Sequence, residues 1–99
     1  MKLVITDEAR ANLVQIADRI ARDNPRRAIS FLNEIEAHCR QISKTPFAYP
    51  ALSGREAGGI RRTVHGNYLI FYRVEPRRVA VIHILHGARD YEALLFPDD

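Results

Sequence analysis

The sequence has no long apolar run, no tryptophan and a single cysteine. No stretch approaches the roughly 20 apolar residues that a membrane-spanning helix requires, so no membrane partner is expected. Residues 1–10 reach acidic side chains before any apolar core, which is unlike a secretory signal and predicts a cytoplasmic location. Cys39 has no disulfide partner, and its place on an apolar helical stripe predicts a small buried side chain.

Metal-binding patterns are also lacking. No CxxC pair or carboxylate cluster completes a ligand set. His83 and His86 are three residues apart on a predicted strand, so their side chains should point to opposite faces. We therefore expect neither a metal nor another cofactor. The 99 residues are expected to form one domain, residues 1–99, with one core.

The positive charge is concentrated in the second half of the chain. Between Arg55 and Arg89 there are seven arginines and two glutamates, whereas residues 90–99 hold four acids and no base. Three of the four histidines fall in the same basic stretch. Such a patch suits nucleic acid, an acidic protein surface or plain solvent, so charge alone leaves the partner open.

The first half predicts a strand followed by a helical hairpin. Residues 2–5 are apolar apart from the first, and Thr6 supplies an N-cap oxygen for the helix that follows. That helix should stop near Asn24, which then caps a second helix with Pro25 at its first position. The second helix should end at Thr45, before Pro46. Its expected buried stripe is Ala28, Leu32, Ile35, Cys39 and Ile42.

The second half predicts a long loop and three antiparallel strands. Residues 45–59 contain two prolines and three glycines, as expected of a surface connection. Strands are predicted at 60–65, 68–75 and 78–86, with tight turns between them. If both turns have two residues, paired residue numbers sum to 133 in the first hairpin and to 153 in the second.

This register divides the strands into two faces. The face that the helices are expected to cover carries Ile60, Val64, Leu69, Phe71, Ala80, Ile82 and Ile84. The other face, expected to stay available, carries Arg61, Thr63, His65, Tyr68, Tyr72 and His83. Pro76 suits a type I turn better than the mirror-image turns of hairpins, and a one-residue slip would exchange His83 for His86.

The predicted fold class is therefore α+β. An N-terminal strand and a helical hairpin pack on a twisted antiparallel sheet, in the order β-α-α-β-β-β, with a short C-terminal segment. The meander of the last three strands carries most of the polar side chains that suit a functional site.

Four phrases, taken in order, resemble one family. They are DNPRRAISFLNEI in the second helix, TPFAYP in the loop, GNYLIFYRV in the middle strand and ILHGARDYEALL near the end. With the element order, they make the chain similar to the RelE/ParE superfamily of toxins from bacterial type II toxin-antitoxin pairs, and most similar to its ParE branch. The resemblance covers nearly the whole chain.

The resemblance implies a binding function. ParE-like members inhibit DNA gyrase and are held inactive by a ParD-like antitoxin whose flexible C-terminal segment wraps the toxin. The expected partners are therefore a ParD-like antitoxin and DNA gyrase, with no catalytic step by this chain. The expected contacts with target or antitoxin are Arg61, His65, Tyr68, Tyr72, His83, Arg89, Tyr91, Leu94, Leu95 and Phe96.

Two alternatives remain open. RelE-like members cut messenger RNA on the ribosome, and that chemistry needs a proton acceptor, a cation near the phosphate and an acid. The residues that could supply these groups are Arg61, His83, Arg89 and Tyr91. RelE-like nucleases carry lysines ahead of and within the first meander strand, whereas this chain has only Lys2 and Lys44, which favours binding. Direct nucleic-acid contact is expected only for this ribonuclease alternative. The second alternative is an inactive member that binds antitoxin.

Overall fold

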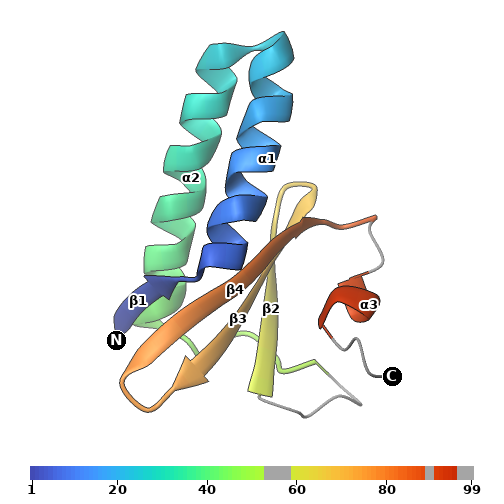
Figure 1. Ribbon diagram of the computed structural model, residues 1–99. Helices are drawn as coiled ribbons and strands as arrows, with labels where there is room; N and C mark the ends of the chain where they lie inside the picture. The colour runs from blue at the N-terminus through green and yellow to red at the C-terminus, as the bar shows by residue number, and fades with distance from the viewer. Residues whose placement is uncertain (53–58, 89–90, 96–99) are drawn as a thin grey trace.

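The chain forms a two-helix layer on a four-stranded sheet, with a short third helix on the opposite side of the sheet (Figure 1). The computed structural model describes residues 1–52, 59–88 and 91–95. The elements in order are β1 (Lys2–Ile5), α1 (Asp7–Asp23), α2 (Pro25–Lys44), β2 (Ile60–His65), β3 (Tyr68–Glu75), β4 (Arg78–His86) and α3 (Tyr91–Leu95). The α+β class and the predicted helix and strand boundaries are confirmed.

Two capping residues define the helical hairpin. Thr6 Oγ1 accepts a hydrogen bond from the Ala9 amide at 3.2 Å and so begins α1. The Asn24 amide donates to the Ile20 carbonyl at the end of α1, and its side chain accepts from the Arg27 amide at 3.1 Å to begin α2. One residue therefore serves both helices, which forces an abrupt reversal of the chain. Within the described residues, no helix is long and apolar enough to cross a membrane.

The sheet is mixed, in the order β1-β4-β3-β2. β2, β3 and β4 form the predicted antiparallel meander, and β1 adds parallel to the first half of β4. The predicted antiparallel meander is therefore present, and β1 joins it as a parallel strand that makes the sheet mixed. A strand that enters a helical hairpin can lie beside a distant strand in either direction, and the sequence pattern does not say which.

The predicted register is confirmed for the first hairpin and for half of the second. Ile60 pairs with Arg73, as the sum of 133 requires. Pairs from Glu75 with Arg78 to Tyr72 with Val81 keep the sum of 153, but Phe71 pairs with His83. Ile82 is thus an extra residue, a β-bulge that shifts the remainder of β4 by one position. As a result His86, and not Leu85, lies opposite Tyr68.

The assignment of the two faces was wrong. The helices cover the face that carries Tyr72, which the sequence suggested was open, together with Ile70 and Val81. Tyrosine and histidine suit this covered face because polar groups of α2 and of the loop after it reach them: Tyr72 donates to the Pro46 carbonyl, and His65 contacts His38 on α2. The buried core between helices and sheet is Ala9, Phe31, Ile35, Cys39, Ile42, Ile70, Tyr72, Val79, Val81 and Ile84.

The opposite face carries a second, smaller core. Ile60, Leu69, Phe71 and Leu85 are buried there, packed against Leu52, Ile82, Tyr91 and Leu95. Ile60, Leu69 and Phe71 were expected beneath the helices, but α3 and the end of the long loop cover them. On α2 one stripe residue also differs from the expectation. Leu32 is 37% exposed, whereas the neighbouring Phe31 is 3% exposed and fills the core.

Candidate functional site

Arg61 lies where β2 meets the loop that follows α2. Its guanidinium donates to the Tyr49 carbonyl and lies over the Phe47 ring, 5.1 Å from the ring centroid. Phe47 is 66% exposed, so an aromatic ring and a cation are presented to solvent together. Arg61 is therefore held in place by its neighbours while remaining partly accessible.

Tyr72 is a core residue. It is fully buried, and its hydroxyl donates to the Pro46 carbonyl at 2.6 Å. Burial raises the pKa of Tyr72 above its usual value, although the Arg61 charge acts in the opposite direction. The side chain joins the sheet to the loop after α2 and has no surface to offer to a partner in this conformation. The expectation that it lines an open face was wrong.

His65, at the end of β2, contacts polar side chains of α2. Its Nδ1 lies 2.9 Å from Nδ1 of His38, and its Nε2 lies 3.4 Å from the Glu34 carboxylate. Glu34 also forms an ion pair with Arg27 at 2.6 Å, and the guanidinium lowers the pKa of that carboxyl. The edge of the Phe31 ring packs against His65. These contacts connect the tip of the β2–β3 hairpin to the middle of α2.

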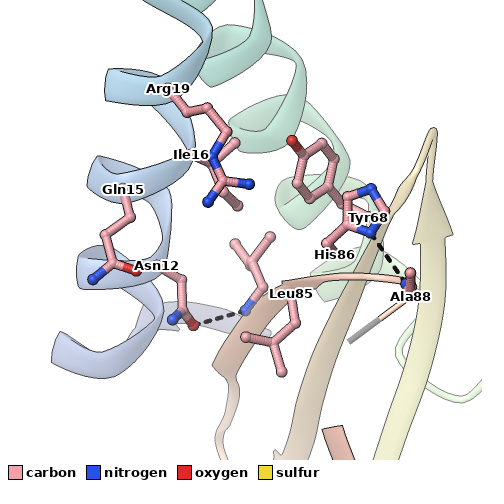
Figure 2. A pocket seen from close by; sticks show the side chains of 9 residues that line it. Asn12, Gln15, Ile16, Arg19, Tyr68, Leu85, His86 and Ala88 are labelled. Atoms are coloured by element: carbon pink, nitrogen blue, oxygen red, sulfur yellow. Dashed lines mark hydrogen bonds between the residues drawn. The ribbon is translucent and has the colours of Figure 1, made fainter. Parts of the chain in front are cut away.

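Tyr68 and His86 line a groove of about 540 Å³ (Figure 2). Their rings meet edge to face, with centroids 5.5 Å apart. On the opposite wall, α1 contributes polar side chains, and Figure 2 shows Arg19 extending into the groove toward Tyr68. The lining residues are Asn12, Gln15, Ile16, Arg19, Tyr68, Ile84, Leu85, His86 and Ala88.

His83 lies directly after the bulge and faces α1. Its Nδ1 is 3.1 Å from the side-chain oxygen of Asn12, which also accepts a hydrogen bond from the Ile84 amide at 3.0 Å. Asn12 thus anchors α1 to β4 at the point where the strand changes register. This arrangement gives His83 a structural contact with the helix.

Tyr91 lies on the other side of the sheet. Arg62 donates to the Tyr91 hydroxyl at 2.9 Å, and the Tyr91 ring packs on Phe71 with centroids 5.0 Å apart. Leu95 packs against the smaller core, and Leu94 is 40% exposed. Arg89 and Phe96 lie outside the described residues.

The expected site residues therefore occupy separate places. Arg61 shares a face with Tyr72, its partner on β3, whereas Tyr91 packs on the smaller core of the opposite face. His83 is held against α1. The described members of the nuclease alternative, namely Arg61, His83 and Tyr91, do not converge on one point. Within the described residues, no group of three metal-ligating side chains comes together either.

Several residues at these places were not predicted from the sequence. His38 and Asn12 lie on helix faces, and nothing in the helical periodicity marks them as partners of sheet histidines. Arg62, which is not among the expected site residues, contacts Tyr91. The pairing of β2 with β3 places Arg62 opposite Phe71, and the Tyr91 ring packs on Phe71. This pairing was the signal in the sequence that Arg62, rather than Arg61, shares a face with Phe71.

Comparison with known proteins supports one family. The family described as ParE toxin of type II toxin-antitoxin system, parDE, matches residues 3–91. The chromosomal ParDE system of P. aeruginosa is similar in structure, with a TM-score of 0.75 at 18% identity, over 87% of this chain and 95% of that chain. The RelBE2 toxin-antitoxin complex of Mycobacterium tuberculosis gives a TM-score of 0.59 at 21% identity, over 86% and 95%. No curated protein matches.

The two solved structures are below 25% identity and show a common fold. The family match spans both helices, the whole meander and the start of α3. The chain belongs to the ParE toxin family of type II toxin-antitoxin systems.

Proposed function

We propose that this chain is the toxin of a toxin-antitoxin pair, that it inhibits DNA gyrase by binding, and that a ParD-like antitoxin neutralises it. The family match supports the toxin role. The observation that carries the choice of binding over catalysis is the separation of Arg61, His83 and Tyr91. General acid-base chemistry needs its groups within hydrogen-bonding reach of one substrate, and these three do not share a surface.

The partly exposed side chains suit a protein interface. Arg61 with Phe47 forms a cation and aromatic pair, and such residue types are enriched where proteins meet. The exposed Leu94 adds an apolar side chain on the α3 side. These features favour recognition of a protein surface and supply no acid-base group.

A supercoiling assay with purified toxin tests the gyrase proposal. Inhibition that saturates with toxin is expected, and Phe47→Ala and Arg61→Ala should each weaken it. Val14→Ala, on an exposed position of α1, is a matched control that leaves inhibition unchanged. Full gyrase activity at saturating wild-type toxin contradicts the proposal.

One contact favours the ribonuclease as the second candidate. Arg62 and Tyr91 are hydrogen-bonded on the α3 side of the sheet, so a cation and a phenol lie together there. The arginine in this pair is Arg62, whereas the sequence suggested Arg61. The TM-score of 0.59 to the RelBE2 complex is in keeping with this alternative. A programmed-ribosome assay on the same preparation decides between the two. Messenger cleavage that Arg62→Ala and Tyr91→Phe abolish, with gyrase unaffected, would replace the gyrase proposal.

A further inference from the structure

Two histidines from distant segments meet where α2 contacts the end of β2. The Nδ1 atoms of His38 and His65 lie 2.9 Å apart, and their ring planes are inclined by 44°. A neutral imidazole has a lone pair on the ring nitrogen that carries no hydrogen, and this lone pair can bind a metal ion. Two facing imidazole nitrogens are therefore a pair of donors that one ion can share.

The spacing of the two nitrogens suits an ion after only a small movement. Zinc binds imidazole nitrogen at about 2.0–2.1 Å, so two nitrogens at the corners of one tetrahedron lie roughly 3.3 Å apart. The Nδ1 atoms of His38 and His65, at 2.9 Å, therefore need to separate by less than about half an ångström. Both side chains are partly exposed, so an ion can reach them from solvent.

Glu34 prepares His65 for this role. Its carboxylate lies 3.4 Å from His65 Nε2 and can only accept, so the ring hydrogen belongs on Nε2 and Nδ1 keeps its lone pair. Arg27 donates to both oxygens of Glu34, at 2.6 Å and 3.2 Å. This hydrogen bonding lowers the pKa of Glu34 and keeps the carboxylate ionised at neutral pH. A carboxylate behind the second ring nitrogen is the usual arrangement around metal-binding histidines.

His38 supplies the second nitrogen. It lies one helical turn after Glu34, so the two side chains are on the same face of α2. Burial, and then the charge of His65, lower the pKa of His38, so its ring is neutral at pH 7. Without an ion, His38 Nδ1 donates to His65 Nδ1. Moving that hydrogen to His38 Nε2 frees both Nδ1 lone pairs and releases no net proton.

The type of ligand determines which ions fit. Imidazole nitrogen suits Zn²⁺, Ni²⁺ and Cu²⁺, whereas Mg²⁺ and Ca²⁺ prefer oxygen ligands. Within the described residues no third ligating side chain joins the two histidines, so water completes the coordination. A site of this kind binds its ion reversibly and more weakly than a structural zinc site with four protein ligands.

We propose that His38 and His65 bind one divalent ion of the zinc, nickel and copper group through their Nδ1 atoms, with Glu34 orienting the His65 ring. The ion connects α2 to the tip of the β2–β3 hairpin, which a hydrogen bond connects in its absence. The sequence predicted no metal site, because His38 reaches His65 only in the folded chain. The proposal names no protein partner and does not depend on the proposed function.

Calorimetric titration of untagged, chelator-treated full-length toxin with zinc chloride tests the site. Wild type should bind one equivalent of zinc and show no comparable binding of Mg²⁺. Losing an outer-shell partner costs about 10- to 100-fold in metal affinity, so Glu34→Gln should weaken zinc binding about tenfold, and His38→Ala and His65→Ala at least as much. The matched controls are Glu36→Gln, on an exposed position of α2, and His86→Ala, at the exposed end of β4. Both should leave the affinity close to wild type.

Nitrogen NMR of the histidine rings gives a readout on the wild-type protein that no variant can confuse with misfolding. Saturating zinc should shift the Nδ1 resonances of His38 and His65 and leave those of His83 and His86 in place. Zinc binding that leaves the His38 and His65 rings unchanged overturns the proposal, and so does wild-type affinity in both alanine variants. A lack of saturable binding at millimolar zinc overturns it as well. The supercoiling assay tests the proposed function separately.

Discussion

His38 on α2 and His65 at the end of β2 face each other through their Nδ1 atoms, which lie 2.9 Å apart. A hydrogen bond at this distance needs one donor and one acceptor, so one Nδ1 carries a hydrogen and the other does not. If His65 donates from Nε2 to Glu34, then His65 Nδ1 is the acceptor and His38 the donor. With both rings protonated, two donors face each other and the contact is lost.

This pair predicts a loss of stability in mild acid. Burial, and then the charge of His65, lower the pKa of His38 below its usual 6.5. Because the unfolded chain takes up this proton at a higher pH than the folded chain does, the free energy of unfolding should fall as the pH drops below about 6.5. The decline continues until the pH passes the lowered pKa of folded His38. Urea unfolding between pH 7.5 and 5 measures it.

The controls for this prediction are two single substitutions. His38→Gln should flatten the pH dependence between pH 7.5 and 5, whereas His86→Gln, on the exposed end of β4, should leave it close to wild type. Other groups around His65 also carry charge, namely Glu34 and Arg27. A pH profile that His38→Gln does not alter would show that another group is responsible.

Tyr72→Phe should destabilise the fold. The substitution removes the hydroxyl that donates to the Pro46 carbonyl and leaves that buried acceptor unpaired. We expect a loss of about 1–3 kcal/mol in the free energy of unfolding. Tyr68→Phe is the matched change on the same strand, at a partly exposed position lining the groove, and it should cost less than about 0.5 kcal/mol. Urea denaturation of both variants checks the difference, and equal losses would contradict the role of the Pro46 contact.

Asn24→Ala should weaken the helical hairpin. The Asn24 side chain accepts from the Arg27 amide in the first turn of α2, and alanine cannot replace that oxygen. The expected loss is about 1 kcal/mol, and Asn24→Asp or Asn24→Ser should recover most of it. Asn33→Ala, in the exposed middle of α2, controls for a change in helix propensity. A stability of Asn24→Ala equal to wild type would be evidence against the cap.

Cys39 should react slowly with thiol reagents. It is fully buried, and burial raises its pKa to about 11, so very little thiolate forms at pH 8. A disulfide reagent should label the native protein much more slowly than the protein in urea. Fast labelling of the native state would show that the helices separate from the sheet far more readily than their packing implies.

Much of the fold was predictable from local sequence signals. Thr6, Asn24 and Pro25 define the helix boundaries because caps and proline act within a few residues. The two-residue turn at Gly66 and Asn67 determines the register of β2 and β3. Gly66 adopts a φ of +59°, a conformation that glycine reaches without strain.

The remainder depended on contacts between distant segments. The middle of β3 is buried on both faces, so alternation separates the faces without saying which one the helices cover. The bulge at Ile82 is stabilised by Thr6 and Asn12, which lie more than 70 positions earlier in the chain. The helical partner of His65 could not be found for the same reason, because His38 reaches it only through the packing of α2 on the sheet.

The extra residue at Ile82 has a genetic consequence. The residues of β4 that face the two long helices have odd numbers before it and even numbers after it, so losing that single codon would leave one uninterrupted alternation. Ile84 and Leu85 would keep their partners on β3 and their places in the two cores. An in-frame loss of three nucleotides at this point should therefore leave the pairing of the sheet intact, and its cost should fall on the contacts that Thr6 and Asn12 make beside the bulge.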